Sequence, residues 1–356
     1  MNRALVALAL AASAAAAGAQ GPLPVNVGGR VIAESGGAMR FGWPGTYFEG
    51  RFRGTSVRIR FEAPADHLRL LVDGEEKALF QRPGLVDFTV GGLVPGEHLV
   101  RLEKMSASQT GGGRFLGFSA GGGGTALPAP RRARQIEFVG DSYTVGYGNR
   151  SPRRECTARE VHDSTDTQQA YGPLVARHFD ADYRIHAYSG FGVVRNYGGR
   201  ERGLSLPAIY DRLKPDASAA VERPDPRWRP QLIVVNLGTN DFSTPLQTGE
   251  PWSSPESLRT AFRSAYAAFV TRLAARQPQA SFVLMAGDTF AAHVAHVAAS
   301  LPAPLRSRIV TVRFGQLELS ACDWHPSLED HRRLAAQLLP MIAGMDLTWP
   351  LGTRRN

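Results

Sequence analysis

Ser142 is the residue whose type and setting point first to chemistry. It ends the trio Gly140-Asp141-Ser142, where a short apolar run stops in a turn-forming sequence. A serine hydroxyl is a weak nucleophile until a neighbouring base takes its proton. Open α/β sheets place reactive groups at the carboxyl ends of buried strands, so Ser142 is a candidate nucleophile. Taken alone, the trio is more often an ordinary turn that caps a helix.

His325 is the best candidate for the base that Ser142 would need. It lies in Asp323-Trp324-His325-Pro326, directly before a stretch with a helical pattern that the proline would begin. A histidine in such a loop is free to present its ring as a general base. The sequence therefore contains both partners of a serine-dependent hydrolase.

Two further segments could stabilise the oxyanion that forms when a serine attacks a carbonyl. Gly190 follows a predicted strand, and a glycine lets its backbone N–H approach a ligand closely. Asn240, in Gly238-Thr239-Asn240-Asp241, follows another strand and offers a side-chain amide. Together with the backbone N–H of Ser142, these donors predict an oxyanion hole. The structural alternatives are a loop glycine and an asparagine that only stabilises its turn.

The elements that must position these residues alternate between strands and helices from Arg131 onward. The predicted strands span residues 135–139, 183–187, 232–236, 281–285 and 309–312, and the predicted helices span 169–178, 206–213, 255–276, 290–299 and 327–342. This alternation predicts an α/β/α domain with a parallel sheet covered on both faces, over residues 131–350.

An all-β pattern precedes this domain, over residues 20–120. Several short strands separated by glycine and proline predict a jelly-roll-like sandwich. Asp73-Gly74, between two apolar runs, predicts a β-hairpin. Residues 121–130 are rich in glycine and proline and are predicted to be a linker between the two domains.

The N-terminus has the features of a secretory signal peptide over residues 1–19. Arg3 supplies the positive charge, an apolar run follows, and small residues precede a cleavage site near Ala19. We expect the mature protein to be secreted or periplasmic. The rest of the chain has no uninterrupted apolar run of about 20 residues, so no membrane span is expected.

The net charge of +9 favours acidic partners, including polysaccharides that carry uronic acids. The arginines are dispersed and no nucleic-acid-binding motif accompanies them, so nucleic acid is not an expected partner. His293 and His296 have a spacing that metals can use, but no carboxylate lies near them and no HExxH motif occurs. Neither a metal nor a cofactor is expected.

The chain contains two cysteines, Cys156 and Cys322. In an oxidising compartment a single pair is expected to form a disulfide, which would join the segment after Ser142 to the segment before His325. The alternative is two buried free thiols.

Taken together and in this order, the four segments resemble the sequence blocks of the SGNH (GDSL-type) hydrolases, over roughly residues 131–345. The amino-acid sequences of these segments are similar to those of carbohydrate esterase family 2. The similarity is found in residues 140–148, 170–172, 189–197 and 238–243. The resemblance implies an N-terminal β-sandwich followed by a flavodoxin-like SGNH domain. It also implies an esterase that removes acetyl groups from plant polysaccharides such as xylan and glucomannan.

Asp323 is where the sequence departs from the resembling superfamily. Most SGNH enzymes orient the histidine with an aspartate three positions before it, where this chain has Cys322. Asp323 lies two positions before His325, and we predict that it completes a triad. The alternative is a Ser–His dyad oriented by a backbone carbonyl. Trp324 is the predicted contact for a sugar ring.

The residues predict a serine esterase, and the resemblance implies that it removes O-acetyl groups from acetylated polysaccharides or oligosaccharides. We expect it to be a monomer. One alternative is a lipase or other acyl-ester hydrolase of the same superfamily. The other is a glycan-binding protein whose catalytic domain is vestigial.

Overall fold

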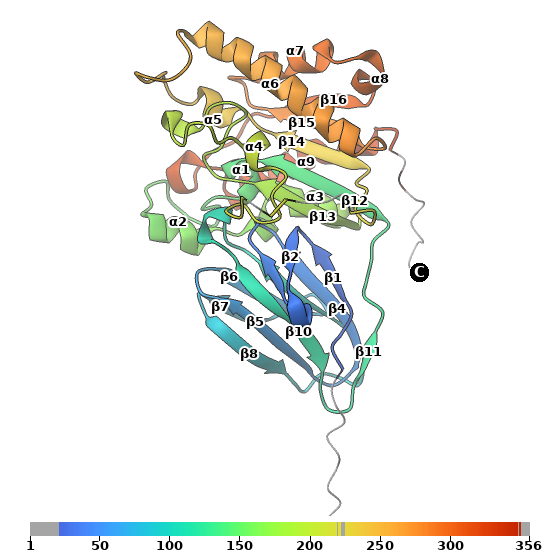
Figure 1. The fold of residues 1–356 in the computed structure, drawn as a ribbon. Helices are drawn as coiled ribbons and strands as arrows, with labels where there is room; N and C mark the ends of the chain where they lie inside the picture. Colours follow the sequence, from blue (N-terminus) through green and yellow to red (C-terminus); the bar gives the residue numbers. More distant parts are fainter. Residues whose placement is uncertain (1–20, 219, 222–224, 348, 350–356) are drawn as a thin grey trace, which may run out of the picture.

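Two stacked antiparallel sheets and a helix-covered parallel sheet make up the protein in a computed structural model (Figure 1). The structure describes residues 21–218, 220–221, 225–347 and 349. The predicted signal peptide and its cleavage site lie outside the described residues. Within the described residues, no helix combines the length and apolar character needed to cross a membrane.

The N-terminal part is the predicted antiparallel sandwich. One sheet has the strand order β1-β4-β9-β6-β7, with β11 also paired to β4, and the other has the order β2-β3-β10-β5-β8. The strands are β1 (Val25–Gly28), β2 (Val31–Ala33), β3 (Met39–Phe41), β4 (Tyr47–Gly54), β5 (Val57–Ala63), β6 (His67–Val72), β7 (Glu75–Gln81), β8 (Gly84–Val90), β9 (Gly96–Lys104), β10 (Gly113–Ala120) and β11 (Thr125–Leu127). Inward-facing aromatic side chains fill the core, as in the stacked pair Phe48 and Phe115, whose ring centroids are 4.1 Å apart.

The predicted hairpin at Asp73-Gly74 is confirmed, since β6 and β7 pair on either side of it. Both turn residues have positive φ, 54° for Asp73 and 85° for Gly74. Two successive positive φ angles are typical of the tight turns whose twist matches that of the flanking strands.

The prediction that residues 121–130 form a linker is wrong for Thr125–Leu127, which form β11. The short strand β1 pairs with β4 only over residues 47–50, so residues 51–53 would be left unpaired on that side. β11 fills this place, with Thr125 opposite Arg53 and Leu127 opposite Arg51. Pairing an otherwise open sheet edge outweighs the weak strand tendency of this stretch.

The C-terminal part has a five-stranded parallel sheet in the order β13-β12-β14-β15-β16. The strands are β12 (Arg134–Gly140), β13 (Ala181–Ala187), β14 (Leu232–Asn236), β15 (Ser281–Ala286) and β16 (Ile309–Arg313). The first strand, β12, therefore lies between the second and the third. This is the flavodoxin-like order, and it confirms the predicted fold class.

Helices cover both faces of this sheet (Figure 1). They are α1 (Ser142–Val145), α2 (Ala158–Ser164), α3 (Tyr171–His178), α4 (Leu206–Ile209), α5 (Thr239–Phe242), α6 (Pro255–Arg276), α7 (Ala291–Ser300), α8 (Ala303–Arg306) and α9 (Leu328–Ala343). The apolar residues of α6 and α7 pack on one face, against Ile233 and Leu284, and those of α3 and α9 pack on the other, against Phe138 and Val283.

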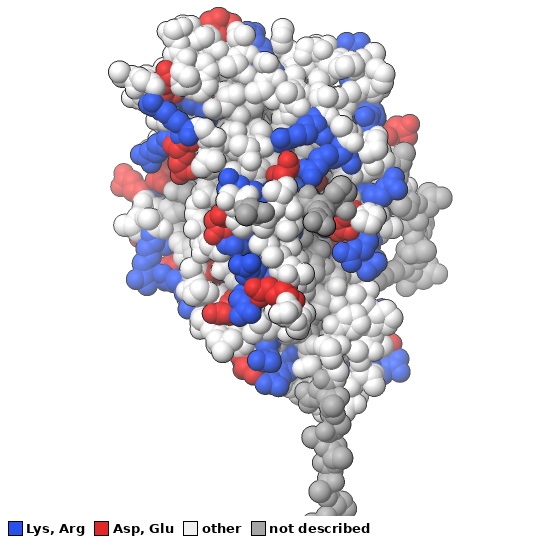
Figure 2. Space-filling model, in the orientation of Figure 1, with Lys and Arg blue, Asp and Glu red and all other residues white. Residues whose placement is uncertain are grey.

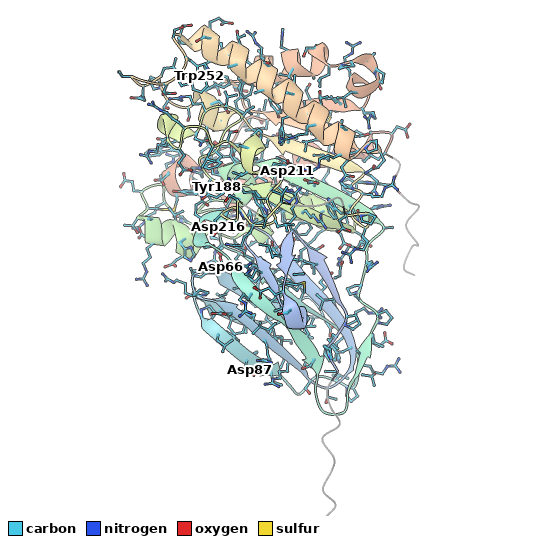
Figure 3. The ribbon with its side chains drawn as sticks, viewed as in Figure 1. Asp66, Asp87, Tyr188, Asp211, Asp216 and Trp252 are labelled. Carbon is cyan, nitrogen blue, oxygen red and sulfur yellow. A yellow bond between two sulfur atoms is a disulfide. The ribbon has the colours of Figure 1, made fainter. Side chains whose placement is uncertain are left out.

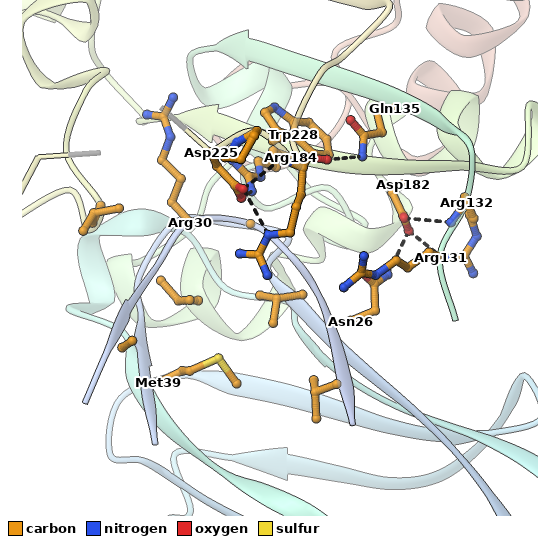
Figure 4. A pocket seen from close by; sticks show the side chains of 18 residues that line it. Asn26, Arg30, Met39, Arg131, Arg132, Gln135, Asp182, Arg184, Asp225 and Trp228 are labelled. Atoms are coloured by element: carbon orange, nitrogen blue, oxygen red, sulfur yellow. Dashed lines mark hydrogen bonds and ion pairs between the residues drawn. The ribbon is translucent and has the colours of Figure 1, made fainter. Parts of the chain in front are cut away.

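The two parts meet over a polar interface. Asp182 at the start of β13 accepts hydrogen bonds from Asn26 Nδ2 (3.1 Å) and Tyr47 Oη (2.8 Å) of the sandwich. A cavity of about 620 Å³ beside Asp182 is also lined by Trp228 and several arginines (Figure 4). Because Asp182 and Gln135 come early in β13 and β12, this cavity lies toward the amino ends of the strands, away from Ser142.

The sandwich also contacts the opposite end of β13. Ser108 Oγ donates to the carbonyl of Ala187 (2.8 Å), and Gln109 Nε2 donates to the carbonyl of Ser189 (2.9 Å). These bonds hold the chain directly before Gly190. The sandwich is thus connected to the loop that carries a predicted oxyanion-hole residue.

The surface charges are mixed rather than gathered into one field. On the face seen in Figure 2, Lys and Arg side chains alternate with Asp and Glu. Ion pairs such as Arg58 with Asp87 account for part of this pattern. Asp87 lies at the far end of the sandwich, whereas Asp66 lies where the sandwich meets the α/β domain (Figure 3).

Candidate active site

Ser142 is the first residue of α1 and directly follows β12 and Asp141. Asp141 caps the helix, since its Oδ1 accepts a hydrogen bond from the N–H of Tyr143 (3.0 Å). Gly140 is required by the tightness of the turn, because a Cβ at this position would lie 1.9 Å from Thr144 Oγ1. The turn places the Ser142 hydroxyl at the carboxyl edge of the sheet.

His325 is in hydrogen-bond contact with this hydroxyl. Its Nε2 lies 2.8 Å from Ser142 Oγ. Its Nδ1 lies 3.0 Å from each of the backbone carbonyls of Cys322 and Asp323. Carbonyls only accept hydrogen bonds, so they favour the tautomer with hydrogen on Nδ1 and leave the Nε2 lone pair facing the serine.

Asp323 reaches the histidine through its backbone and not through its side chain. Its Oδ2 accepts a hydrogen bond from the hydroxyl of Tyr147 (2.9 Å), and its carboxylate makes no hydrogen bond to His325 among the residues that the structure describes. Asp323 and Trp324 both have left-handed backbones, with φ of 50° and 56°. This local geometry brings the carbonyl of Asp323 to Nδ1 and turns the side chain toward Tyr147. The geometry therefore favours the carbonyl-oriented alternative over the predicted triad.

The loop before His325 is held by several bonds. A disulfide joins Cys322 to Cys156, and the N–H of Asp323 donates to the carbonyl of Arg154 (2.6 Å). Non-glycine residues with positive φ store strain and persist only where the surroundings fix them. Two of them in succession beside a reactive side chain point to a loop shaped for His325.

The environment of His325 favours the neutral imidazole. Burial lowers the pKa of His325, and the two carbonyl contacts only partly oppose this effect. The ring of Tyr147 lies against the imidazole, with ring centroids 4.3 Å apart. The side chain is therefore suited to accept a proton near neutral pH.

Gly190 occupies the loop after β13. Its φ of 85° lies in the left-handed region, which favours glycine. A Cβ built at this position would meet no described heavy atom within 4 Å, so the space beside it is open. Its carbonyl accepts a hydrogen bond from the N–H of Tyr197 (2.8 Å). That bond holds the loop in place while the open side remains accessible to a ligand.

Asn240 lies in α5, directly after β14. Its Nδ2 donates to the carbonyl of Phe191 (2.9 Å) and lies 3.4 Å from Asp141 Oδ2. The second contact is long for a hydrogen bond. One amide hydrogen therefore fixes the side chain, and the other is weakly engaged and available to a developing oxyanion.

Asp241 is a positioning residue whose role the sequence pattern does not predict. Its carboxylate accepts hydrogen bonds from three successive backbone N–H groups, those of Val193 (2.9 Å), Val194 (2.9 Å) and Arg195 (3.0 Å). Burial raises its pKa to about 6, despite these bonds. Asp241 thus ties the loop that follows Gly190 to α5. Its place beside Asn240 was the only signal in the sequence.

The structure brings all four predicted segments together. Ser142, Gly190 and Asn240 follow the three adjacent strands β12, β13 and β14, around the point where the strand order reverses. His325 enters from the loop before α9, and the neighbouring Trp324 is 58% exposed. His293 packs against the ring of Phe242 at the end of α5 (5.3 Å between centroids).

Comparison with known proteins shows which families and proteins have sequences similar to this chain. Residues 27–130 match the family described as Carbohydrate esterase 2 N-terminal, and residues 138–329 match the GDSL-like Lipase/Acylhydrolase family. An acetylxylan esterase / glucomannan deacetylase of Cellvibrio japonicus is 41% identical, covering 92% of this chain and 93% of that protein. The cellulase/esterase CelE of Acetivibrio thermocellus is 29% identical, covering 84% of this chain and 37% of that protein.

Solved structures agree with the sequence matches. A carbohydrate esterase whose active site displays divergent catalytic and non-catalytic binding functions has a TM-score of 0.87 and 40% identity, covering 93% of this chain and 100% of that one. A family two carbohydrate esterase from Clostridium thermocellum in complex with cellohexaose has a TM-score of 0.76 and 28% identity, covering 89% of this chain and 98% of that one.

Proposed function

Because this chain belongs to carbohydrate esterase family 2 and is a carboxylic ester hydrolase, we propose that it removes O-acetyl groups from polysaccharides of the xylan or glucomannan type. The observation that carries the proposal is the 2.8 Å contact between Ser142 Oγ and His325 Nε2. That contact supplies the activated hydroxyl that ester cleavage requires. The matched Cellvibrio japonicus relative, named for both substrates, supports the choice of glycan.

The first half of the reaction makes an acetyl-enzyme. His325 Nε2 takes the hydroxyl proton as Ser142 Oγ attacks the acetyl carbonyl carbon. The backbone N–H groups of Ser142 and Gly190 and the Asn240 amide stabilise the oxyanion. When the tetrahedral intermediate collapses, the bond to the sugar oxygen breaks and His325 gives its proton to that oxygen. A hydroxyl group is thereby restored on the sugar.

The second half releases acetate by the reverse route. His325 takes a proton from a water molecule, whose oxygen attacks the acetyl carbon. The same donors hold the second oxyanion, and its collapse returns the proton to Ser142 Oγ. The carbonyls of Cys322 and Asp323 hold the imidazole in one orientation throughout, so the residues form a Ser–His dyad. Trp324 offers an exposed aromatic face to the sugar ring next to the reacting ester.

The function is tested by measuring acetate release from acetylated xylan and acetylated glucomannan. The same preparation is assayed on acetyl and octanoyl esters of one chromogenic alcohol. We expect acetate from the polysaccharides and a strong preference for the acetyl ester. Equal cleavage of the octanoyl ester would favour a lipase-like activity, and no cleavage of any ester would favour a binding protein.

The pH profile of kcat/KM should have an acidic limb that is set by His325. Only the neutral imidazole accepts the serine proton, and burial lowers the pKa of His325. The value of kcat/KM should therefore rise with pH and reach its plateau at a lower pH than for an exposed histidine. We expect the midpoint of the limb below about pH 6.5, the ordinary value for histidine. A midpoint above about pH 7 would mean that a nearby negative charge stabilises the imidazolium.

The variant Asp323→Asn tests the dyad against the predicted triad. Asparagine tolerates the left-handed backbone and keeps the carbonyl that contacts Nδ1. We expect kcat/KM within about tenfold of the wild-type value. A tenfold change corresponds to a difference in the free energy of activation about equal to the contribution of one hydrogen bond. The matched variant Tyr147→Phe, which removes the partner of the carboxylate, should behave similarly. A loss near 10⁴, as when a triad aspartate is replaced, would restore the carboxylate to an orienting role.

A further inference from the structure

Two histidine rings are in edge-to-face contact where the sandwich meets the α/β domain. His67 is the first residue of β6 and is 1% exposed, and His162 lies in α2. Their ring centroids are 4.4 Å apart, and the ring planes meet at 65°. Asp163 follows His162 directly, so two elements from different parts of the chain bring three candidate ligands together.

Both Nε2 atoms are buried and have no hydrogen-bond partner among the described residues. Asp163 Oδ1 lies 3.5 Å from His67 Nε2, within ion-pair distance but without the geometry of a hydrogen bond. Buried polar atoms are rarely left without a partner, and two such nitrogens in contacting rings are unusual. One ligand atom from each of the three residues lies within 4.8 Å of the other two.

We propose that His67, His162 and Asp163 bind a divalent transition-metal ion such as Zn²⁺, which would join β6 to α2. The two imidazole nitrogens and a carboxylate oxygen would supply three ligands, and solvent a fourth. A small inward movement of the side chains would bring atoms now within 4.8 Å to the spacing of ligands around one ion.

The surrounding charges favour a metal that is bound by nitrogen. Arg82 and Arg159 lie 3.4 Å and 3.5 Å from the carboxylate of Asp163, so an ion held by charge alone would be repelled. Ca²⁺ and Mg²⁺ need several oxygen ligands, and this site offers one carboxylate. Imidazole ligands suit Zn²⁺, Ni²⁺ and Cu²⁺.

A lysine also lies near the two rings. The nearby Lys104 is already paired with Asp66 (2.6 Å), which leaves its charge partly neutralised.

The position of α2 gives such an ion a structural role. α2 begins two residues after Cys156, whose disulfide partner Cys322 accompanies His325. Thr165, which ends the helix, accepts a hydrogen bond from the N–H of Gly148 (2.9 Å). An ion that held α2 to the sandwich would steady the segments on both sides of the Ser–His pair without contacting either residue.

Calorimetric titration of the chelator-treated full-length chain with Zn²⁺ tests this proposal. We expect about one equivalent to bind and the melting temperature to rise with Zn²⁺ concentration, since binding to the folded state stabilises it. Mg²⁺ and Ca²⁺ should give neither effect. An unchanged melting temperature and no heat with Zn²⁺ would overturn the proposal.

Single-residue variants locate the ion. His162→Gln and Asp163→Asn should weaken Zn²⁺ binding by more than the roughly 10- to 100-fold that the loss of an outer partner costs. The matched control His296→Gln removes a histidine on α7 and should bind Zn²⁺ like the wild type. Circular dichroism checks folding, and if His162→Gln does not fold, Asp163→Asn decides. Wild-type affinity in the folded variants would place the ion elsewhere and overturn the assignment.

Discussion

The variant Ser142→Ala should lose acetyl-ester hydrolysis almost completely, with kcat reduced by on the order of 10⁴ or more. Without Oγ, no acetyl-enzyme can form, and His325 has no proton to take from residue 142. The protein should still fold. Asp141 rather than Ser142 caps α1, and the lost hydrogen bond contributes only about 1 kcal/mol to the stability.

Acetate release and thermal unfolding of the same preparation separate these two effects. Ser300→Ala is a matched control, because Ser300 is exposed at the end of α7, and this variant should keep wild-type turnover. If Ser142→Ala kept more than about a tenth of the wild-type kcat, another residue would be the nucleophile.

Most of the α/β domain could be predicted from the sequence because its local signals agree with its tertiary structure. Leu232–Asn236 and Pro255–Arg276 lie where the apolar runs and the helix cap predicted them. In α6, Ser254 and Ser257 form a capping box, and Pro255 is the first helical residue. The signals for β14 and α6 lie within the segments themselves.

The elements that sequence reasoning missed depend on distant partners. Thr125–Leu127 become a strand because β1 is too short to cover β4, and no pattern inside the segment indicates this. Residues 158–164 form the capped helix α2, which was not predicted in a stretch that has few apolar residues. Burial is limited to Val161 within this helix, so it lacks a clear apolar period.

The residues of the candidate site also fall into two groups, those that local sequence patterns predict and those whose role depends on the tertiary structure. The four segments could be identified because each carries its reactive group at the end of a predicted strand or before a predicted helix. The role of Asp323 could not be predicted, because it depends on φ angles of 50° and 56° at two adjacent residues. The cluster of His67 with His162 and Asp163 could not be predicted from the sequence either, because only tertiary packing brings β6 close to α2.

The second large effect is expected for Asn240→Ala, with kcat reduced by about 10² to 10³. The carbonyl of Phe191 accepts one amide hydrogen of Asn240 and so fixes the side chain. The second amide hydrogen can donate to the oxyanion, and it binds the oxyanion more strongly than it binds the carbonyl oxygen of the substrate. A loss of this kind appears mainly in kcat, because the donor acts where charge develops. The corresponding cost is about 3 to 4 kcal/mol of transition-state stabilisation.

A matched variant distinguishes oxyanion stabilisation from loop positioning. Asn196 anchors the loop after Gly190, which Asn240 also contacts through the carbonyl of Phe191. The Oδ1 of Asn196 accepts a hydrogen bond from the N–H of Gly192 (3.1 Å), and its Nδ2 donates to the carbonyl of Leu204 (2.9 Å). Asn196→Ala removes these anchors but no predicted oxyanion donor, so its kcat should fall less than about tenfold while thermal stability falls. Equal losses of kcat in the two variants would show that Asn240 acts by holding the loop. An effect of Asn240→Ala confined to KM would likewise remove it from the oxyanion hole, which would then consist of the backbone N–H groups of Ser142 and Gly190.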